Sequence, residues 1–188
     1  MNYYTSSHDE LAVALGLAPN AKKSVLAQVK IYNATKPQHN CSILHNHLTI
    51  DTEILDVSFL IKKSFLVTLT HDSKRHQQVN IFKVGRQDKL ISYLNLPEGE
   101  IAQKIVLGDK HSVFFAVVGR RVCKIMSFNS QDGILELARD VLQNTHFEGE
   151  IADAVWLIDP PQLVIATTAN KLYKIKTFDG AYEVDQVV

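Results

Sequence analysis

The chain has 188 residues, 46% of them apolar, which is enough to bury the core of one domain and excludes an intrinsically disordered protein. Its 20 Lys and Arg residues balance 20 Asp and Glu residues, so the chain as a whole has no strong electrostatic attraction to nucleic acid, although a local patch remains open. No stretch approaches the roughly 18 consecutive apolar residues of a membrane-spanning helix, which excludes such a span.

Residues 3–50 form the first predicted unit. Strands are predicted over residues 11–17, 25–32 and 42–50 because these runs are apolar or alternate and are bounded by turn residues. The opening strand of this unit must fit into residues 3–6 or is missing. The unit is therefore expected to be partial.

The next two units, residues 54–96 and 101–142, each contain four predicted strands. The predicted strands are 54–59, 65–70, 78–84 and 90–96, followed by 101–107, 113–118, 122–128 and 134–142. Leu135-Glu136-Leu137-Ala138-Arg139 alone favours a helix, but its place in the unit favours a strand. The last unit, residues 151–188, is divided into strands by Asp159-Pro160-Pro161, Ala169-Asn170 and Asp179-Gly180. Its strands are predicted over 151–157, 162–168, 171–178 and 182–188.

These units repeat at a period of 50 residues. Gln28-Val29-Lys30-Ile31-Tyr32 returns as Gln78-Val79-Asn80-Ile81-Phe82, and Gly99-Glu100-Ile101-Ala102 returns as Gly149-Glu150-Ile151-Ala152. A period of this size in β-rich units indicates a propeller or a similar array. We predict an all-β fold of β-propeller blades, three complete four-stranded antiparallel blades plus one partial, in a single domain over residues 1–188.

The second strand of each unit is almost wholly apolar, as in Val113 to Val118, so we expect it to be buried on both faces by stacked sheets. The aromatic residues that end the third strands are expected to pack between blades; they are Tyr32, Phe82, Phe128 and Phe178. Trp156, the only tryptophan, is interpreted as core rather than as an exposed binding residue.

On these features the chain resembles the WD40 and WD40-like β-propeller families, over about residues 10–188. The Trp-Asp pair of WD40 repeats is replaced by Tyr32-Asn33, Phe82-Lys83, Phe128-Asn129 and Phe178-Asp179. The side-chain hydrogen-bond network of well-formed WD40 blades is therefore not expected in this chain. The resemblance implies a propeller similar to those of large eukaryotic assemblies, including ribosome-assembly, RNA-modification, nuclear-pore and trafficking complexes.

A closed propeller needs about four to eight blades, and this chain supplies at most four. We therefore expect it to be part of a larger or partner-completed propeller and not to work as an isolated monomer, since open ends would expose apolar faces and strand edges. The contact surfaces are expected on the outer faces of the first and last units, around residues 11–17 and 163–178.

Signatures of catalysis are absent from the sequence: there is no GxSxG, no phosphate-binding glycine loop, no HExxH and no zinc-type Cys/His spacing. We predict that the chain is not an enzyme and has no cofactor, metal or small-molecule substrate; catalysis in a central channel is the weakest alternative. His39, His45 and His47 could hold a metal or sense pH, but are interpreted as solvent-facing residues.

The function predicted from the sequence is a non-catalytic protein-protein interaction scaffold, with other subunits completing or capping the propeller. The alternative is an RNA-associated propeller subunit that positions RNA for a partner enzyme. Its phosphate contacts would be drawn from six basic residues, which could equally be solvated turn charges. They are Lys62, Lys63, Lys74, Arg75, Arg120 and Arg121. Two cysteines without CxxC spacing and the lack of a secretory signal predict a cytoplasmic or nuclear protein.

Overall fold

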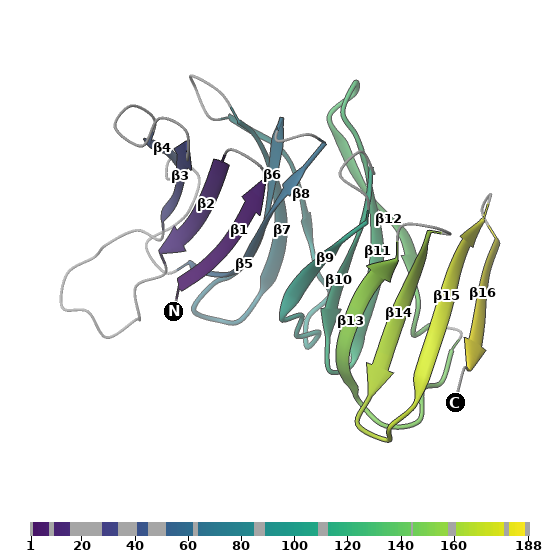
Figure 1. Ribbon diagram of the computed structural model, residues 1–188. Coiled ribbons are helices and arrows are strands. Elements are labelled where there is room, and N and C mark those ends of the chain that lie inside the picture. Colours follow the sequence, from purple (N-terminus) through teal and green to yellow (C-terminus); the bar gives the residue numbers. More distant parts are fainter. Residues whose placement is uncertain are drawn as a thin grey trace.

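A computed structural model describes the fold (Figure 1). It describes residues 2–7, 10–15, 28–33, 41–44, 52–61, 64–84, 89–108, 113–143, 145–157, 161–178 and 181–186. All regular secondary structure within these residues is β-strand. The predicted all-β class is therefore confirmed. None of the described segments forms a helix that could cross a membrane.

The sixteen strands form four four-stranded antiparallel sheets, and each sheet takes its strands in chain order. The first sheet contains β1 (Asn2–Ser7), β2 (Glu10–Leu15), β3 (Gln28–Asn33) and β4 (Cys41–Leu44). The second contains β5 (Glu53–Leu60), β6 (Phe65–His71), β7 (Gln77–Lys83) and β8 (Lys89–Asn95). The third contains β9 (Lys104–Leu107), β10 (Phe114–Gly119), β11 (Val122–Asn129) and β12 (Ile134–Asp140). The fourth contains β13 (Ile151–Leu157), β14 (Gln162–Thr167), β15 (Leu172–Phe178) and β16 (Ala181–Gln186).

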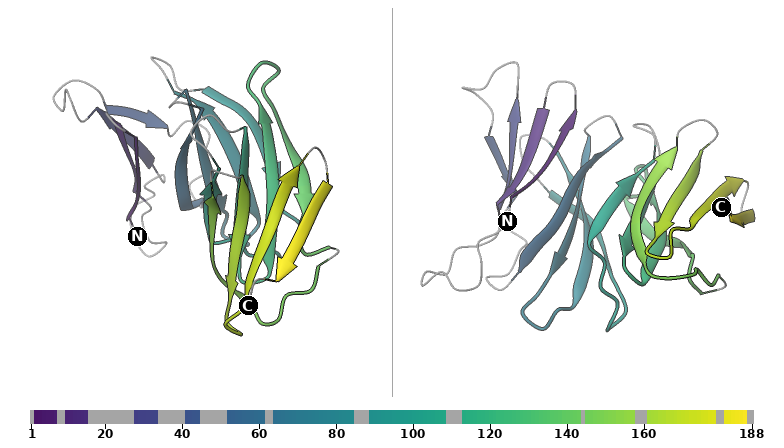
Figure 2. Two further views of the ribbon diagram at one scale, coloured as in Figure 1. Left: turned by 45° about the vertical axis from the view of Figure 1, so that its right-hand side comes forward. Right: turned by 60° about the horizontal axis from the view of Figure 1, so that its bottom comes forward.

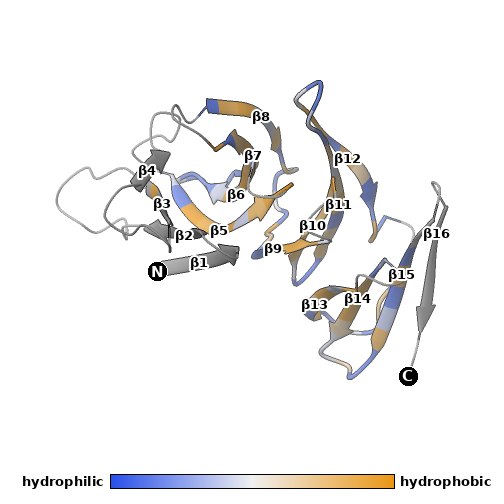
Figure 3. Cartoon of the chain, turned by 45° about the horizontal axis from the view of Figure 1, so that its top comes forward, coloured by the Kyte–Doolittle hydropathy of each residue, from blue (hydrophilic) through white to orange (hydrophobic). Residues whose placement is uncertain are grey.

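The sheets pack face to face in chain order along an arc (Figure 2). β5, β9 and β13, the first strands of their sheets, lie on the inner side of the arc, and β8 and β12, the last strands of theirs, lie on its outer side (Figure 3). Successive inner strands contact one another, β1 with β5, β5 with β9 and β9 with β13. The four sheets form an open arc, which is the arrangement of consecutive propeller blades.

Apolar cores fill the spaces between neighbouring sheets. Between the first and second sheets, Val29 packs with Ile54, Val57 and Phe59. The core between the second and third sheets contains Val67, Leu69, Val79, Ile81, Phe115, Val117, Met126 and Phe128. The core between the third and fourth sheets contains Ala116, Val118, Cys123, Ile125, Ala154, Trp156, Leu163, Ile165 and Ile175. Each sheet-to-sheet step is therefore built by alternate side chains of the facing strands.

Several predictions about burial are confirmed. Phe82 and Phe128 are buried between sheets, and Phe65 meets Phe128 edge to face with ring centroids 5.0 Å apart. Trp156 is core, at 8% exposure. The side chains of Tyr32 and Phe178, and residues 25–27 and 45–50 of two predicted strands, lie outside the described residues.

Two departures from the predicted strands have a structural explanation or change the count of strands. β9 begins at Lys104 and not at residue 101, because the buried Gln77 side chain takes both backbone groups of Ala102. Its Nε2 donates to the Ala102 carbonyl at 2.9 Å, and its Oε1 accepts the Ala102 N–H at 2.7 Å. In the first unit the opening strand is present as β1, paired with β2 along its whole length.

Candidate interaction surface

The outer face of the last sheet combines apolar residues with lysines, since Lys174 pairs with Val164 and Lys176 pairs with Gln162 on this face. Strand alternation puts five apolar residues on the face of β13–β16 that points away from the third sheet. They are Val155, Leu157, Val164, Ala166 and Leu172. Val155 is 54% exposed, and Leu157 and Leu172 are each 39% exposed. We call these five residues the end face.

In the second sheet, the corresponding face is the one that points toward the third sheet, and the third sheet covers it. Val67 and Leu69 of β6 are fully buried because the third sheet packs on them. In β14 the corresponding alternation leaves Val164 and Ala166 half-buried, while Leu163 and Ile165 are fully buried against the third sheet. The prediction that every second strand is buried on both faces holds for β6 and β10 but not for β14. The contact surface expected around residues 163–178 thus contains only alternate residues of that range.

An acidic residue on the inner strand ties the second sheet to the third. Asp56 lies at a bulge in β5, where its Oδ1 accepts the Val57 N–H at 2.8 Å. Its Oδ2 accepts the Ile105 N–H of β9 at 2.7 Å. Burial raises the pKa of Asp56 above its ordinary value even though these bonds favour the carboxylate. The Asp56 carboxylate therefore holds β9 against β5, although its own burial disfavours the charged form.

Asp153 occupies the same place in the last sheet. It also lies at a bulge of the first strand, and its Oδ1 also accepts the N–H of the next residue, Ala154, at 2.8 Å. Lys104 of β9 bonds to Asp153 Oδ1 and to the Ala154 carbonyl, the latter at 3.0 Å. The bond from Lys104 lowers the pKa of Asp153. No described sheet follows β13–β16. Within the described residues, Asp153 Oδ2 therefore has no backbone N–H of a next inner strand to accept, as Asp56 Oδ2 accepts that of Ile105.

Asp56 provides a test of this inter-sheet contact. We expect Asp56→Ala to lower the free energy of unfolding by about 1 to 3 kcal/mol, because two backbone N–H groups lose their acceptor. Urea unfolding followed by circular dichroism would measure it. Glu136→Ala, an exposed carboxylate on β12, is the control and should change stability by less than about 0.5 kcal/mol. Equal effects of the two substitutions would show that the Asp56 bonds contribute nothing.

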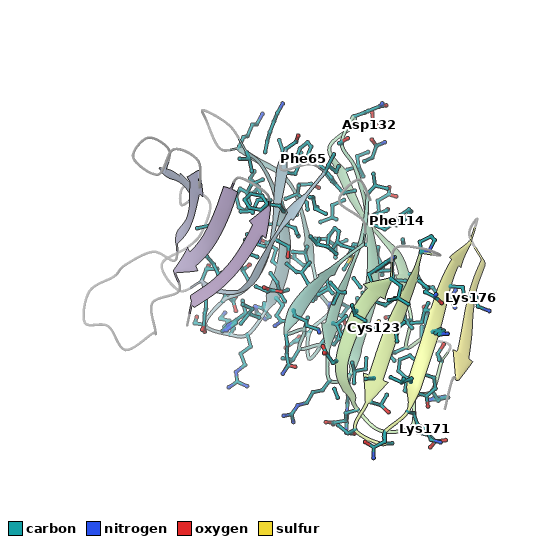
Figure 4. All side chains as sticks on the ribbon, in the orientation of Figure 1. Phe65, Phe114, Cys123, Asp132, Lys171 and Lys176 are labelled. Atoms are coloured by element: carbon teal, nitrogen blue, oxygen red, sulfur yellow. The ribbon has the colours of Figure 1, made fainter. Side chains whose placement is uncertain are left out.

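The predicted basic contacts are partly brought together. Lys74 and Arg75 lie in the β6–β7 turn and Arg120 and Arg121 in the β10–β11 turn, and antiparallel order puts both turns on one rim. Figure 4 shows Lys171 of the β14–β15 turn at this rim and Asp132 at the opposite one. Lys62 and Lys63 lie outside the described residues.

Acidic links interrupt this rim. Glu150, in the link before β13, bonds to Arg121 Nε at 3.1 Å and lies 4.0 Å from Arg120 Nη1. In the other turn, Asp72 Oδ1 accepts the backbone N–H groups of Lys74 and His76, each at 2.9 Å. Acidic groups thus lie beside the basic ones. The RNA hypothesis gains no support from the described residues, since carboxylates beside Lys and Arg weaken the attraction of phosphate.

The histidine cluster, His39, His45 and His47, lies outside the described residues. Among the residues that the structure describes, no group of three His, Cys, Asp or Glu side chains could hold a metal ion. Cys123 is a free thiol, and burial raises its pKa to about 12. It is therefore packed as a small apolar residue.

Sequence reasoning missed the two inner-strand aspartates. The signal was present: Glu53-Ile54-Leu55-Asp56 returns as Glu150-Ile151-Ala152-Asp153. The two copies of this motif are two units apart, because the corresponding residue of the unit between them is Lys104. A search at the 50-residue period therefore does not find the motif.

No family model and no curated protein sequence matches the chain. Its fold is similar to solved structures of low identity. Sqt1 of Saccharomyces cerevisiae is 16% identical with a TM-score of 0.62, covering 96% of this chain and 45% of that one. The β-propeller domain of Cps50 (Swd1) from Myceliophteria thermophila is 13% identical with a TM-score of 0.62, covering 97% and 58%. A candidate 6-phosphogluconolactonase from Bacteroides uniformis is 11% identical with a TM-score of 0.64, covering 98% and 52%.

These similarities define the class of the chain as a propeller-type all-β protein, and at such identities they show the fold alone. The chain spans about half the length of each of these three proteins.

One prediction needs correction. The prediction that the chain is not an enzyme is wrong as it stands, because the fold is shared with a protein described as a candidate 6-phosphogluconolactonase. A second such protein, from Bacteroides fragilis, is 10% identical with a TM-score of 0.61. The lack of catalytic motifs in the sequence therefore does not exclude catalysis on this fold, and the similarity itself assigns the chain no reaction.

Proposed function

We propose that this chain is a WD40-like propeller subunit that holds other proteins in a larger complex of the cytoplasm or nucleus. The observation that carries the proposal is the end face, where Val155 and Leu157 of β13 and Leu172 of β15 are exposed, with the half-buried Val164 and Ala166 of β14 between the two strands. Contiguous exposed apolar surface of this kind is typical of a protein-protein contact. Lys74 and Arg75, on the rim, are proposed as further partner contacts.

Two double variants test the proposal in cells that express the protein. Val155→Glu with Leu157→Glu puts two charges on the end face, and Tyr93→Glu with Leu137→Glu puts two charges on exposed outer-strand residues, at 57% and 44% exposure. Quantitative co-purification should show specific proteins, including any second copy of the chain, that are lost from the end-face variant and kept by the control.

Equal recovery of every associated protein with both variants would refute the proposal. Circular dichroism must show that both variants are folded, which we expect because all four side chains are exposed and such changes cost little stability.

A further inference from the structure

We infer that the β6–β7 turn, residues 72–76, binds a carboxylate-rich segment of a partner protein through Lys74 and Arg75. The inference rests on the proposed function and names the chemistry of the partner at one of its contacts. It follows from a comparison of this turn with the β10–β11 and β14–β15 turns on the same rim.

Asp72 fixes the backbone of the β6–β7 turn from within. Its N–H donates to the His76 carbonyl at 3.1 Å, and its carbonyl accepts the Arg75 N–H at 3.0 Å. Its Oδ1 accepts the N–H groups of Lys74 and His76, each at 2.9 Å. The side chains of Lys74 and Arg75 take no part in these bonds and are exposed. The turn therefore presents two cations on a backbone that needs no further ordering when a partner binds.

The β14–β15 turn has the same backbone bonds but a different residue at one position. The Thr167 N–H donates to the Lys171 carbonyl at 3.0 Å, and the Thr167 carbonyl accepts the Asn170 N–H at 3.1 Å. Arg75 and Asn170 thus correspond, and their φ angles are 65° and 60°. Asn is one of the residues that adopt this left-handed region most readily, whereas Arg is not. The backbone of the turn therefore gives no reason for Arg75, and we attribute its side chain to an external contact.

The partner of that contact is not found within the described residues, where neither Lys74 nor Arg75 bonds to a carboxylate. In the β10–β11 turn, by contrast, Arg121 Nε lies 3.1 Å from Glu150 Oε1, and Arg120 Nη1 lies 4.0 Å from Glu150 Oε2. An Arg guanidinium binds a carboxylate through two parallel N–H donors, and an adjacent Lys adds a second positive charge. Lys74 and Arg75 are therefore suited to the carboxylates of another protein.

The acidic residues of the rim favour a protein segment over RNA. Glu98 and Glu148 are exposed in the links before β9 and β13, and Glu150 lies beside the β10–β11 turn. These carboxylates would repel a phosphate chain that ran along the rim. A protein segment can bring its own carboxylates to one turn alone, which gives a complementary contact without that repulsion.

The experiment is an NMR titration of the purified, isotope-labelled protein with a synthetic hexaglutamate peptide at low ionic strength. We expect larger shifts of the amide signals of residues 72–76 than of residues 119–122. Lys74→Gln with Arg75→Asn should weaken binding by about fivefold or more. The matched control, Arg120→Gln with Arg121→Gln, should weaken it by less than about twofold, because Glu150 already balances those charges.

Arg75→Asn alone separates the contact from the stability of the turn. Because Asn suits the left-handed backbone, this variant should keep or raise the urea midpoint of unfolding. It should still weaken hexaglutamate binding by about twofold or more. A lower midpoint would show that Arg75 stabilises the turn itself, and this result would overturn the inference.

Equal weakening by the two double variants would also overturn the inference. So would hexauridylate RNA that shifts the same amide signals at lower concentration than hexaglutamate, or the absence of any shift at millimolar peptide concentration. If the titration fails but the end-face variant loses protein partners in cells, this inference fails and the proposed function stands. If the peptide binds the turn as expected but no partner is lost from the end-face variant, the inference stands and the proposed role of the end face fails.

Discussion

Phe115→Ala is expected to lower the free energy of unfolding by about 3 to 5 kcal/mol. The Phe115 side chain is fully buried in the core between the second and third sheets. Replacing it removes most of its apolar contacts and leaves a cavity, because two stacked sheets cannot collapse around one missing ring. Urea unfolding at neutral pH, read by circular dichroism, measures the change.

Phe114→Ala is the matched control. Phe114 is the neighbouring residue on β10, points to the other side of the strand and is 38% exposed; Figure 4 labels it. Its loss should cost less than about 1.5 kcal/mol, because a partly exposed ring buries less area. A cost below about 0.5 kcal/mol for Phe115→Ala would show that the register of β10 is wrong.

Strands were predictable where local pattern and sheet packing agree. The prediction over 151–157 coincides with β13, and β12 forms over Ile134–Asp140, within the predicted 134–142, despite its helix propensity because it pairs with β11. The start of β9 was not predictable. It depends on the Gln77 side chain reaching Ala102, 25 residues away, and side-chain bonds of this kind leave no periodic trace in the sequence.

The candidate surface was predictable only in part. Apolar runs in the last unit indicated an open face, but every residue of Ala154-Val155-Trp156-Leu157 is apolar. Which of them are covered depends on a bulge that shifts the alternation between Ile151 and Asp153. The basic residues were visible in the sequence, whereas the pairing of Arg120 and Arg121 with Glu150 arises only when the third and fourth sheets stack.

A buried ion pair in the third sheet gives the second large effect. Lys124 of β11 is 3% exposed and bonds to Asp140 of β12 and to Glu100 of the link before β9, the latter at 3.0 Å. Burial disfavours the ammonium, but the bonds to Asp140 and Glu100 outweigh it and raise the pKa of Lys124 above its ordinary value of 10.5. The cation thus joins β12 to the link that leads from the second sheet into β9.

Lys124→Met should lower the free energy of unfolding by about 3 to 5 kcal/mol, because it leaves two partly buried carboxylates without their cation. Since the pKa of Lys124 is raised in the folded state, its contribution is fully present below pH 10.5 and is lost as the pH rises through the folded-state pKa. Urea unfolding at neutral and alkaline pH should therefore show a wild-type advantage that is constant near neutrality and shrinks above pH 10.5.

The triple variant Lys124→Met, Glu100→Gln, Asp140→Asn separates the charge from the packing. Removing all three charges avoids uncompensated carboxylates, and replacing a whole buried ionic group by neutral side chains is often close to neutral in stability. We expect the triple variant to regain more than half of the loss. If it is as unstable as Lys124→Met alone, the Lys124 side chain stabilises the sheet by packing its methylene groups and not by pairing with Glu100 and Asp140.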